Sequence, residues 1–311
     1  LDAPVVMTTN ARGILPPDHP LGVSLSPSMA ATRALIAGAD VVLAIGTEMG
    51  PTDYDFFEDG GFELSGMLIR ADIDAAQIQR GKAPAMAIVG DARLTAEALA
   101  AGIGTSGMKD GAARAAAAQA GRTALPRAIQ GDLHLLDLVR GTLPEALIVG
   151  DSTQLVYAGN TAFAAATPGS YFNSATGFGT LGYGLPAAVG ARLSGDRPVV
   201  ALSGDGGLQF TLGELASAAE ARVPVVLMLH DNKGYGEIRS SMIAQNVPPL
   251  GVDILTPDLG AIAAACGWRV ERLHKIADLP EMLRRGIAAD GPTMIVFGDA
   301  LRDEAQAAAG F

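Results

Sequence analysis

Short apolar runs alternate with helix-like segments along most of this sequence, and this alternation restricts the possible folds more than any other feature. Several of the runs are apolar throughout, which is typical of strands buried on both faces of a parallel sheet. Strands that alternate with helices in this way predict an α/β protein with doubly wound sheets. The expected strands are residues 4–8, 40–46, 67–72, 85–90, 146–150, 198–204, 224–230 and 293–297.

The alternation falls into two series, which predict two doubly wound parallel-sheet domains. We expect residues 1–103 to form a Rossmann-like domain that is truncated at its N-terminus, because the first residues already have the pattern of a strand. Residues 104–131 are rich in Gly and Ala and predict a linker with an Ala-rich helix. Residues 132–311 form the second domain. The expected helices are residues 28–37, 91–101, 181–193, 212–222, 257–266 and 276–289.

Charge and composition exclude several classes of function. The formal net charge of −11 argues against a nucleic-acid partner, which would need a basic face. No apolar run approaches the roughly 18 residues of a membrane helix, and no signal peptide is visible, so we expect a cytoplasmic protein without a membrane partner. Cys266 is the single cysteine and cannot form an internal disulfide.

The most specific motif is the run Gly204-Asp205-Gly206-Gly207, which follows a buried strand. Glycines at the carboxyl end of a strand let the backbone approach an anion, and free N–H groups beside a helix N-terminus favour phosphate. Thr211 and Glu214 have the spacing of a capping box and predict that a helix opens there. Asp205 would repel a phosphate, so its position makes sense if a cation bridges the two.

A second loop supplies further oxygen ligands. The run from Asp231 to Gly236 contains Asn232 and follows the next strand, after one helical crossover. Right-handed crossovers make the two strands parallel and place both loops on one edge of the sheet. A carboxylate, an amide oxygen and a backbone carbonyl form a site of the kind that Mg²⁺ prefers. Each loop alone is an ordinary turn sequence, but the two at this spacing are far more specific.

Together the two loops resemble the fingerprint of thiamine-diphosphate-dependent enzymes, which begins with Gly-Asp-Gly and ends with Asn. The family usually ends in Asn-Asn, where this chain has Asp231-Asn232. The resemblance implies thiamine diphosphate and Mg²⁺ as cofactors, with Asp205 and Asn232 as side-chain ligands of the metal and Gly234 as a carbonyl ligand. The other cofactor-binding residues expected on these loops are Gly204, Gly206, Gly207 and Tyr235.

Residues 177–188 resemble the segment before the fingerprint in acetolactate synthases and benzoylformate decarboxylases. By that match the carbonyl of Gly179 accepts a hydrogen bond from the 4′-amino group of the cofactor. Leu181 is the apolar wedge that bends the cofactor, with simple core packing as the alternative. Residues 150–154 match a loop that also touches the diphosphate. The candidate donors there are Ser152, Thr153 and Gln154.

The first series resembles the central domain of the same enzymes, at residues 18–21 and 71–74. In acetolactate synthases this domain holds FAD, but the Arg-Phe-Asp-Asp-Arg stretch expected after Gly46 is absent. We therefore expect no FAD. Residues 46–55 are instead similar to enzymes called 5-guanidino-2-oxopentanoate decarboxylase.

The resemblance implies decarboxylation of a 2-oxo acid, with 5-guanidino-2-oxopentanoate as a candidate substrate. Glu237 stands where related enzymes often carry apolar or small residues, and an acidic group suits a cationic substrate. The alternative is a solvated Glu237 that pairs with Arg239. Gly179, Leu181 and Glu237 are the residues expected to act in catalysis.

In the family the activating Glu belongs to an N-terminal pyrimidine-binding domain, which we expect in the full-length chain and without which the enzyme is incomplete. The family's site lies between subunits, so we also expect a homodimer or homotetramer. Two other functions stay open. One is carboligation of 2-oxo acids, as in acetolactate synthases. The other is a non-catalytic nucleotide-binding module, although the Gly-x-Gly-x-x-Gly array that it needs is missing at the first βα turn.

Overall fold

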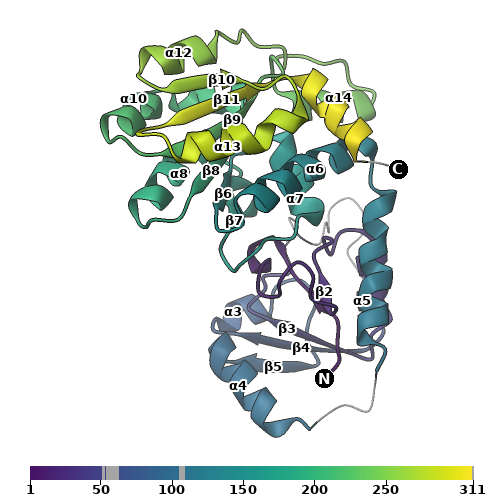
Figure 1. Ribbon diagram of the computed structural model, residues 1–311. Coiled ribbons are helices and arrows are strands. Elements are labelled where there is room, and N and C mark those ends of the chain that lie inside the picture. Colours follow the sequence, from purple (N-terminus) through teal and green to yellow (C-terminus); the bar gives the residue numbers. More distant parts are fainter. Residues whose placement is uncertain (51–52, 54–62, 105–108, 310–311) are drawn as a thin grey trace. The chain divides into compact units, whose positions relative to one another are not determined.

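The computed structural model describes residues 1–50, 53, 63–104 and 109–309 (Figure 1). By its contacts the chain divides into two compact units. The first comprises Leu1–Ala11 with Leu15–Ala124, and the second comprises Arg12–Ile14 with Leu125–Phe311. Every strand pairing in the described residues is parallel, as the continuous apolar runs predict. The domain boundaries expected near residues 103 and 131 remain predictions.

The first unit contains a parallel sheet in which β4 lies between β3 and β5. The strand expected at residues 4–8 is shorter in the structure. It pairs with a strand that the sequence did not predict, and the two form a separate sheet. The strands are β1 (Val5–Val6), β2 (Gly22–Val23), β3 (Val41–Ile45), β4 (Met67–Asp72) and β5 (Met86–Val89). The helices are α1 (Ala30–Ala37), α3 (Ala75–Ile78), α4 (Ala92–Gly102) and α5 (Gly111–Gln119), with 3-10 turns at Thr9–Ala11 and Ala120–Ala124.

Local hydrogen bonds explain where helices of the first unit begin. The side chain of Asp74 accepts from the N–H of Ala76 at 2.8 Å and caps α3. Asp91 caps α4 in the same way, through the N–H of Leu94 at 3.0 Å. Such caps satisfy N–H groups that have no partner within the helix. Both helices therefore start directly after an aspartate that ends a strand or its turn.

The second unit is built on a six-stranded parallel sheet with the order β10-β11-β9-β8-β6-β7. Its four inner strands are those that the sequence predicted, and the two edge strands are additions. The edges were missed because they are short and partly polar, as in the Arg-Val-Glu-Arg sequence of β10. The strands are β6 (Leu147–Gly150), β7 (Tyr171–Asn173), β8 (Val199–Gly204), β9 (Val225–His230), β10 (Arg269–Arg272) and β11 (Thr293–Phe297).

Helices cover both faces of this sheet. The sequence did not predict α6, α7, α9, α11 or α14. The helices are α6 (Arg127–Thr142), α7 (Gln154–Ala162), α8 (Gly184–Leu193), α9 (Asp205–Leu208), α10 (Gly213–Glu220), α11 (Gly236–Ala244), α12 (Leu259–Ala265), α13 (Leu279–Ile287) and α14 (Asp299–Ala308). The 3-10 turns are Ser174–Thr176, Gln209–Thr211 and Ile276–Asp278. Within the described residues, no helix combines the length and the apolar character needed to cross a membrane.

The capping box expected at Thr211 and Glu214 was wrong. The chain already turns into α9 at Asp205, and α10 has Leu212 at its N-cap without a side-chain hydrogen bond. Thr211 instead donates its hydroxyl to the carbonyl of Gly182, at 3.1 Å. The helical path starts at the strand tip itself, which brings its first N–H groups close to the carboxyl edge of the sheet.

The core of the second unit follows the two-residue period of a strand. Val225, Leu227 and Leu229 of β9 pack in one cluster with residues of α8, α10 and α12. Val226, between them, points to the other face, where a Cβ on Gly286 of α13 would meet it at 2.7 Å. Strands buried on both faces need apolar residues at every position, which is why these segments are continuous apolar runs.

Trp268 offers a test of this core. Its indole Nε1 donates to the carbonyl of Leu215 at 2.7 Å, and both residues are buried. We expect Trp268→Phe to lower the free energy of unfolding by about 1–3 kcal/mol, because a buried carbonyl loses its donor. Urea unfolding followed by circular dichroism measures the change. Phe210→Leu, at an exposed aromatic, serves as the control, and an equal loss in both variants would contradict the assignment.

Candidate functional site

The candidate site lies at the carboxyl edge of the sheet in the second unit. β8 and β9 are paired neighbours with Gly204 opposite His230, and β6 pairs with the other side of β8. The loops that begin at Asp151, Asp205 and Asp231 therefore emerge side by side. Such an edge, outside the ends of parallel strands, is where open α/β sheets bind ligands.

Three oxygen-bearing groups converge between the loops after β8 and β9. Asp205 is fully buried, and its Oδ2 accepts from the hydroxyl of Thr256 at 2.7 Å. One end of the Asn232 amide lies 2.9 Å from both Asp205 Oδ1 and the carbonyl oxygen of Gly234. With nitrogen at that end the amide donates to both. With oxygen there, three oxygens meet, and a cation is needed to reconcile them.

This donor set fits the expected metal. A carboxylate, an amide oxygen and a backbone carbonyl are hard oxygen ligands, and Mg²⁺ usually completes its octahedron with phosphate oxygens and water. The structure thus brings together Asp205, Asn232 and Gly234, the three residues that the sequence proposed as ligands. Their role in binding a metal stays a prediction.

Glycines allow the two loops to approach this closely. A Cβ on Gly206 would lie 2.8 Å from the ring of Tyr235, and a Cβ on Gly234 would overlap the carbonyl oxygen of Val252. The same carbonyl accepts from the N–H of Tyr235 at 2.9 Å, which holds the loop in place. Gly204 and Gly207 are packed as well, against Thr153 and Asp151. Side chains at these positions would push the loops apart.

Asp151 organises the loop after β6, and the sequence did not single it out. Its Oδ1 accepts from the N–H groups of Ser152 at 2.7 Å and Gly182 at 3.1 Å, and its Oδ2 accepts from Gly184 at 3.1 Å. Burial raises the pKa of this carboxyl above its usual value, while the backbone donors oppose the shift. A buried carboxylate surrounded by N–H groups thus ties residues 182–184 to the tip of β6.

The residues expected to orient the cofactor lie beside this loop. The carbonyl of Gly179 accepts from the Ser152 hydroxyl at 3.0 Å, and that hydroxyl also lies 2.8 Å from Ser174 Oγ. Gly179 has a φ of +67°, a conformation that glycine adopts without strain. Leu181 is half-buried, and Thr153 is buried. The hydroxyl of Ser152 has two acceptors, so it can turn to Ser174 and leave the Gly179 carbonyl available to another donor.

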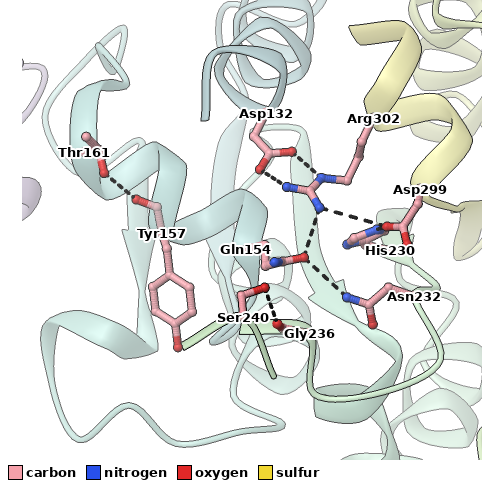
Figure 2. A network of polar contacts seen from close by, with 10 residues as sticks. All are labelled: Asp132, Gln154, Tyr157, Thr161, His230, Asn232, Gly236, Ser240, Asp299 and Arg302. Carbon is pink, nitrogen blue, oxygen red and sulfur yellow. Dashed lines mark hydrogen bonds and ion pairs between the residues drawn. The ribbon is translucent and has the colours of Figure 1, made fainter. Parts of the chain in front are cut away.

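Gln154 belongs to a polar network that the sequence did not reveal (Figure 2). Its Oε1 lies 3.0 Å from Arg302 Nη1 and 3.4 Å from Asn232 Nδ2. Arg302 forms a two-pronged ion pair with Asp132, at 2.6 and 2.7 Å. A polar hollow of about 320 Å³ opens beside this network, lined among others by Gln154, Asn232, Gly236 and Arg302.

His230 has a structural place next to this network. It is buried at the end of β9, its ring stacks on that of Phe297 with centroids 5.2 Å apart, and its Nε2 lies 2.9 Å from Asp299 Oδ1. The hydrogen bond with His230 is the main cause that lowers the pKa of Asp299.

Glu237 is exposed in the first turn of α11. Burial is the main cause that raises the pKa of Tyr157 in α7, and the negative charge of Glu237 adds to this increase. Arg239, the alternative partner of Glu237, has its Nε 3.5 Å from Asp253 Oδ1. Glu237 thus belongs to the helix that follows the loop carrying Asn232 and Gly234.

The segment behind the substrate hypothesis, residues 46–55, lies partly outside the described residues, because residues 51–52 and 54–55 belong to the undescribed part. Asp53 is described. Its Oδ1 accepts from the N–H of Thr9 at 2.9 Å, and its backbone carbonyl accepts from the hydroxyl of Ser26 at 3.2 Å. This aspartate is an anchor of the first unit.

Comparison with known proteins identifies the family. Residues 1–99 match the central domain of thiamine pyrophosphate enzymes, and residues 151–297 match their C-terminal TPP-binding domain. The chain belongs to the thiamine pyrophosphate enzyme family. Thiamine pyrophosphate is another name for thiamine diphosphate, so the resemblance drawn from the fingerprint is confirmed.

Individual relatives agree with this family. The chain is 40 % identical over 302 residues to a Pseudomonas aeruginosa protein named "Probable 2-ketoarginine decarboxylase AruI". The matched region covers 95 % of this chain and 53 % of the relative. It is 32 % identical to a benzoylformate decarboxylase of the same species, over 91 % of this chain and 51 % of that protein.

A solved structure matches as well. The thiamine diphosphate-dependent 4-hydroxybenzoylformate decarboxylase of Rhodococcus jostii RHA1 shares 28 % identity and superposes with a TM-score of 0.74, over 95 % of this chain and 56 % of that one. The doubly wound parallel-sheet fold expected from the sequence is thereby confirmed. The chain spans about half the length of the relatives it matches.

The close approach at Gly234 can be tested directly. We expect Gly234→Ala to lower the free energy of unfolding by about 1–3 kcal/mol, because the new methyl group would overlap a backbone carbonyl that cannot move alone. Gly190→Ala in α8 is the matched control, since a Cβ there meets nothing within 4 Å and favours the helix. Thermal and urea unfolding measure both variants. Equal stability of the two would refute the close approach.

Proposed function

We propose that the protein binds thiamine diphosphate with Mg²⁺ and catalyses the decarboxylation of a 2-oxo acid. The proposal is carried by the convergence of Asp205, Asn232 and Gly234 within 2.9 Å contacts at the carboxyl edge of the sheet. The family match and decarboxylases among the relatives support it. When bound, thiamine diphosphate supplies a carbon nucleophile and an electron sink for the departing carboxylate.

In this proposal the chain's own residues bind and orient the cofactor. Asp205, Asn232 and Gly234 hold Mg²⁺, and the metal offsets the negative charge between Asp205 and the diphosphate. The N-termini of α7 and α11 direct free N–H groups toward the same edge, which favours a phosphate there. Ser152, Thr153 and the glycines at residues 204, 206 and 207 are the expected neighbours of the diphosphate.

Two further residues would set the conformation of the cofactor. The Gly179 carbonyl is proposed to accept from its 4′-amino group once the Ser152 hydroxyl turns to Ser174, which lies 2.8 Å away. Leu181 is proposed to support the bend between the two rings of the cofactor. Both residues belong to the loop that Asp151 anchors through its neighbours Gly182 and Gly184.

For the substrate we propose 5-guanidino-2-oxopentanoate, which is 2-ketoarginine. The 40 % identical relative carries that compound in its name. Glu237 lies at the start of α11, beside the candidate site, and its carboxylate suits a guanidinium group because such pairs form charge-assisted hydrogen bonds. Decarboxylation would release the corresponding guanidino aldehyde and CO₂.

The whole protein is proposed to be a cytoplasmic homodimer or homotetramer. Its pyrimidine-binding domain, by resemblance to the family, would supply the Glu that activates the cofactor. The residues described here would then contribute the diphosphate half of each site.

The metal site is tested by Asp205→Ala. We expect wild type to bind thiamine diphosphate in a Mg²⁺-dependent way and the variant to lose more than about 100-fold in affinity, since losing even an outer-shell partner costs roughly 10–100-fold. Calorimetry with and without Mg²⁺ measures this. Asp196→Ala, an exposed aspartate before β8, is the control. Unchanged binding by Asp205→Ala would remove the basis of the proposal.

The substrate proposal is tested by Glu237→Gln. We expect kcat/KM for 2-ketoarginine to fall about 10- to 100-fold, because a hydrogen bond to a charged group contributes about 1.5–3 kcal/mol, while benzoylformate and pyruvate change little. Glu214→Gln, at the first turn of α10, is the matched control. A wild-type preference for pyruvate with acetolactate as product would instead favour carboligation.

A further inference from the structure

Arg302 occupies an unusual position for a residue of the last helix. Its guanidinium forms the two-pronged pair with Asp132 of α6, through Nε at 2.7 Å and Nη2 at 2.6 Å. The side chains of the two residues are 13 % and 2 % exposed. Buried charges of this kind need complete pairing, because an unpaired one is costly. The pair uses two of the guanidinium nitrogens, Nε and Nη2, and does not involve Nη1.

The remaining nitrogen, Nη1, faces Gln154 and also lies 4.0 Å from Asp299 Oδ1 (Figure 2). Arg302 Nη1 donates to Gln154 Oε1 at 3.0 Å, and the same oxygen lies 3.4 Å from Asn232 Nδ2. A Cβ on Gly236 would fall within 3.2 Å of Gln154 Oε1 and would overlap Asn232 Nδ2, so the glycine gives this contact its space. Three side chains from α14, α7 and the loop after β9 thus form one chain of contacts.

The donor or acceptor character of each group determines the direction of the hydrogen bonds in this series of contacts. A guanidinium can only donate, so Gln154 must turn its amide oxygen, and not its nitrogen, toward Arg302. That oxygen can only accept, so the contact with Gln154 favours an Asn232 amide whose nitrogen faces Gln154. The oxygen of the Asn232 amide is then left at the other end, which lies 2.9 Å from Asp205 Oδ1 and from the Gly234 carbonyl oxygen.

The opposite orientation of Asn232 competes when no cation is bound. Its nitrogen would then donate to both Asp205 Oδ1 and the Gly234 carbonyl oxygen. That arrangement satisfies the oxygens but places an N–H donor where a metal ligand is needed. Every metal-binding event would have to break those two hydrogen bonds and turn the amide. Arg302 opposes this competing orientation of Asn232, because its donor Nη1 keeps the Gln154 oxygen in place to accept from the Asn232 nitrogen.

We propose that Arg302 is a positioning residue that acts through Gln154 to hold the Asn232 amide oxygen toward the Mg²⁺ site. The inference rests on the proposed function, because it presupposes that Asp205, Asn232 and Gly234 bind the metal. Arg302 itself contacts neither metal nor diphosphate in this role. Partners behind a metal ligand commonly orient it in this way.

A purely structural role for Arg302 would be to fasten α14 to α6 through Asp132. That role needs only Nε and Nη2, and it makes no use of the contact between Nη1 and Gln154. The two roles predict different behaviour, because fastening changes stability, whereas positioning changes metal affinity at constant stability.

The test uses the full natural protein and a double variant, Asp132→Asn with Arg302→Gln. Removing both charges leaves no unpaired buried ion, so the fold is retained. A glutamine at position 302 can donate or accept and no longer imposes a direction. Free Mn²⁺ is followed by its EPR signal during titration with protein at fixed thiamine diphosphate. Thermal unfolding is measured without metal or cofactor.

We expect the double variant to bind Mn²⁺ about 10-fold more weakly or worse, with an unfolding midpoint close to that of wild type. Arg302→Lys keeps a group that can only donate and should retain most of the affinity. Arg272→Gln, which removes an exposed arginine that pairs with Asp258 at 3.0 Å, is the control and should change nothing.

Wild-type Mn²⁺ affinity in the double variant would overturn the positioning role. The same conclusion would follow if Arg302→Lys lost as much affinity as the double variant, or if Arg272→Gln did. A wild-type protein that binds no Mn²⁺ in the presence of thiamine diphosphate would refute the proposed function itself, and the role of Arg302 with it.

Discussion

The parallel pairing of β8 with β9 is the constraint on which the site depends. Gly204 and His230 are paired across the two strands, so the residues that follow them leave the sheet at the same height. A shift of this register by one residue would turn each side chain to the opposite face, and the buried positions of both strands resist such a shift. The distance between Asp205 and Asn232 is therefore set by the packing of the sheet, well away from any ligand.

Backbone groups also hold the loops at this edge of the sheet in position. Asp151 is surrounded by N–H donors of its own loop and of residues 182–184, which fixes the segment that carries Gly179 and Leu181. The close approach of Gly206 to Tyr235 brings the loop after β8 against the loop after β9. Both arrangements place functional groups through main-chain geometry. A site of this kind is preorganised because few of its parts can rotate.

Much of this could be predicted from the sequence, for identifiable reasons. The four inner strands of the second unit are long apolar runs because helices cover both of their faces, and such runs are visible without a structure. The family was recognisable from the loops after two of these strands, and the match to its central and C-terminal domains confirms it. The edge strands β7 and β10 were not predictable, because a strand with one neighbour needs no continuous apolar run.

The partners of the site residues were hidden for a different reason. Asp132 and Arg302 are 170 positions apart and meet only when α6 and α14 pack together. Asp151 looked like one more polar residue in a turn, and only its burial shows that it holds the loop. The capping-box prediction failed because the pattern at Thr211 was judged locally, whereas the helical path had already begun at Asp205. Local sequence patterns locate the ends of strands well, but they do not reveal which distant residues hold the loops at these ends in place.

The ion pair between Asp132 and Arg302 has a practical consequence for handling this protein. α14 looks dispensable, since it is the last helix of this sequence and half of its exposed positions carry acidic residues. Trimming it to aid crystallisation would nevertheless strip the counter-ion from an almost completely buried aspartate in the middle of α6. Expression tags and truncations are therefore better placed so that they leave this helix whole.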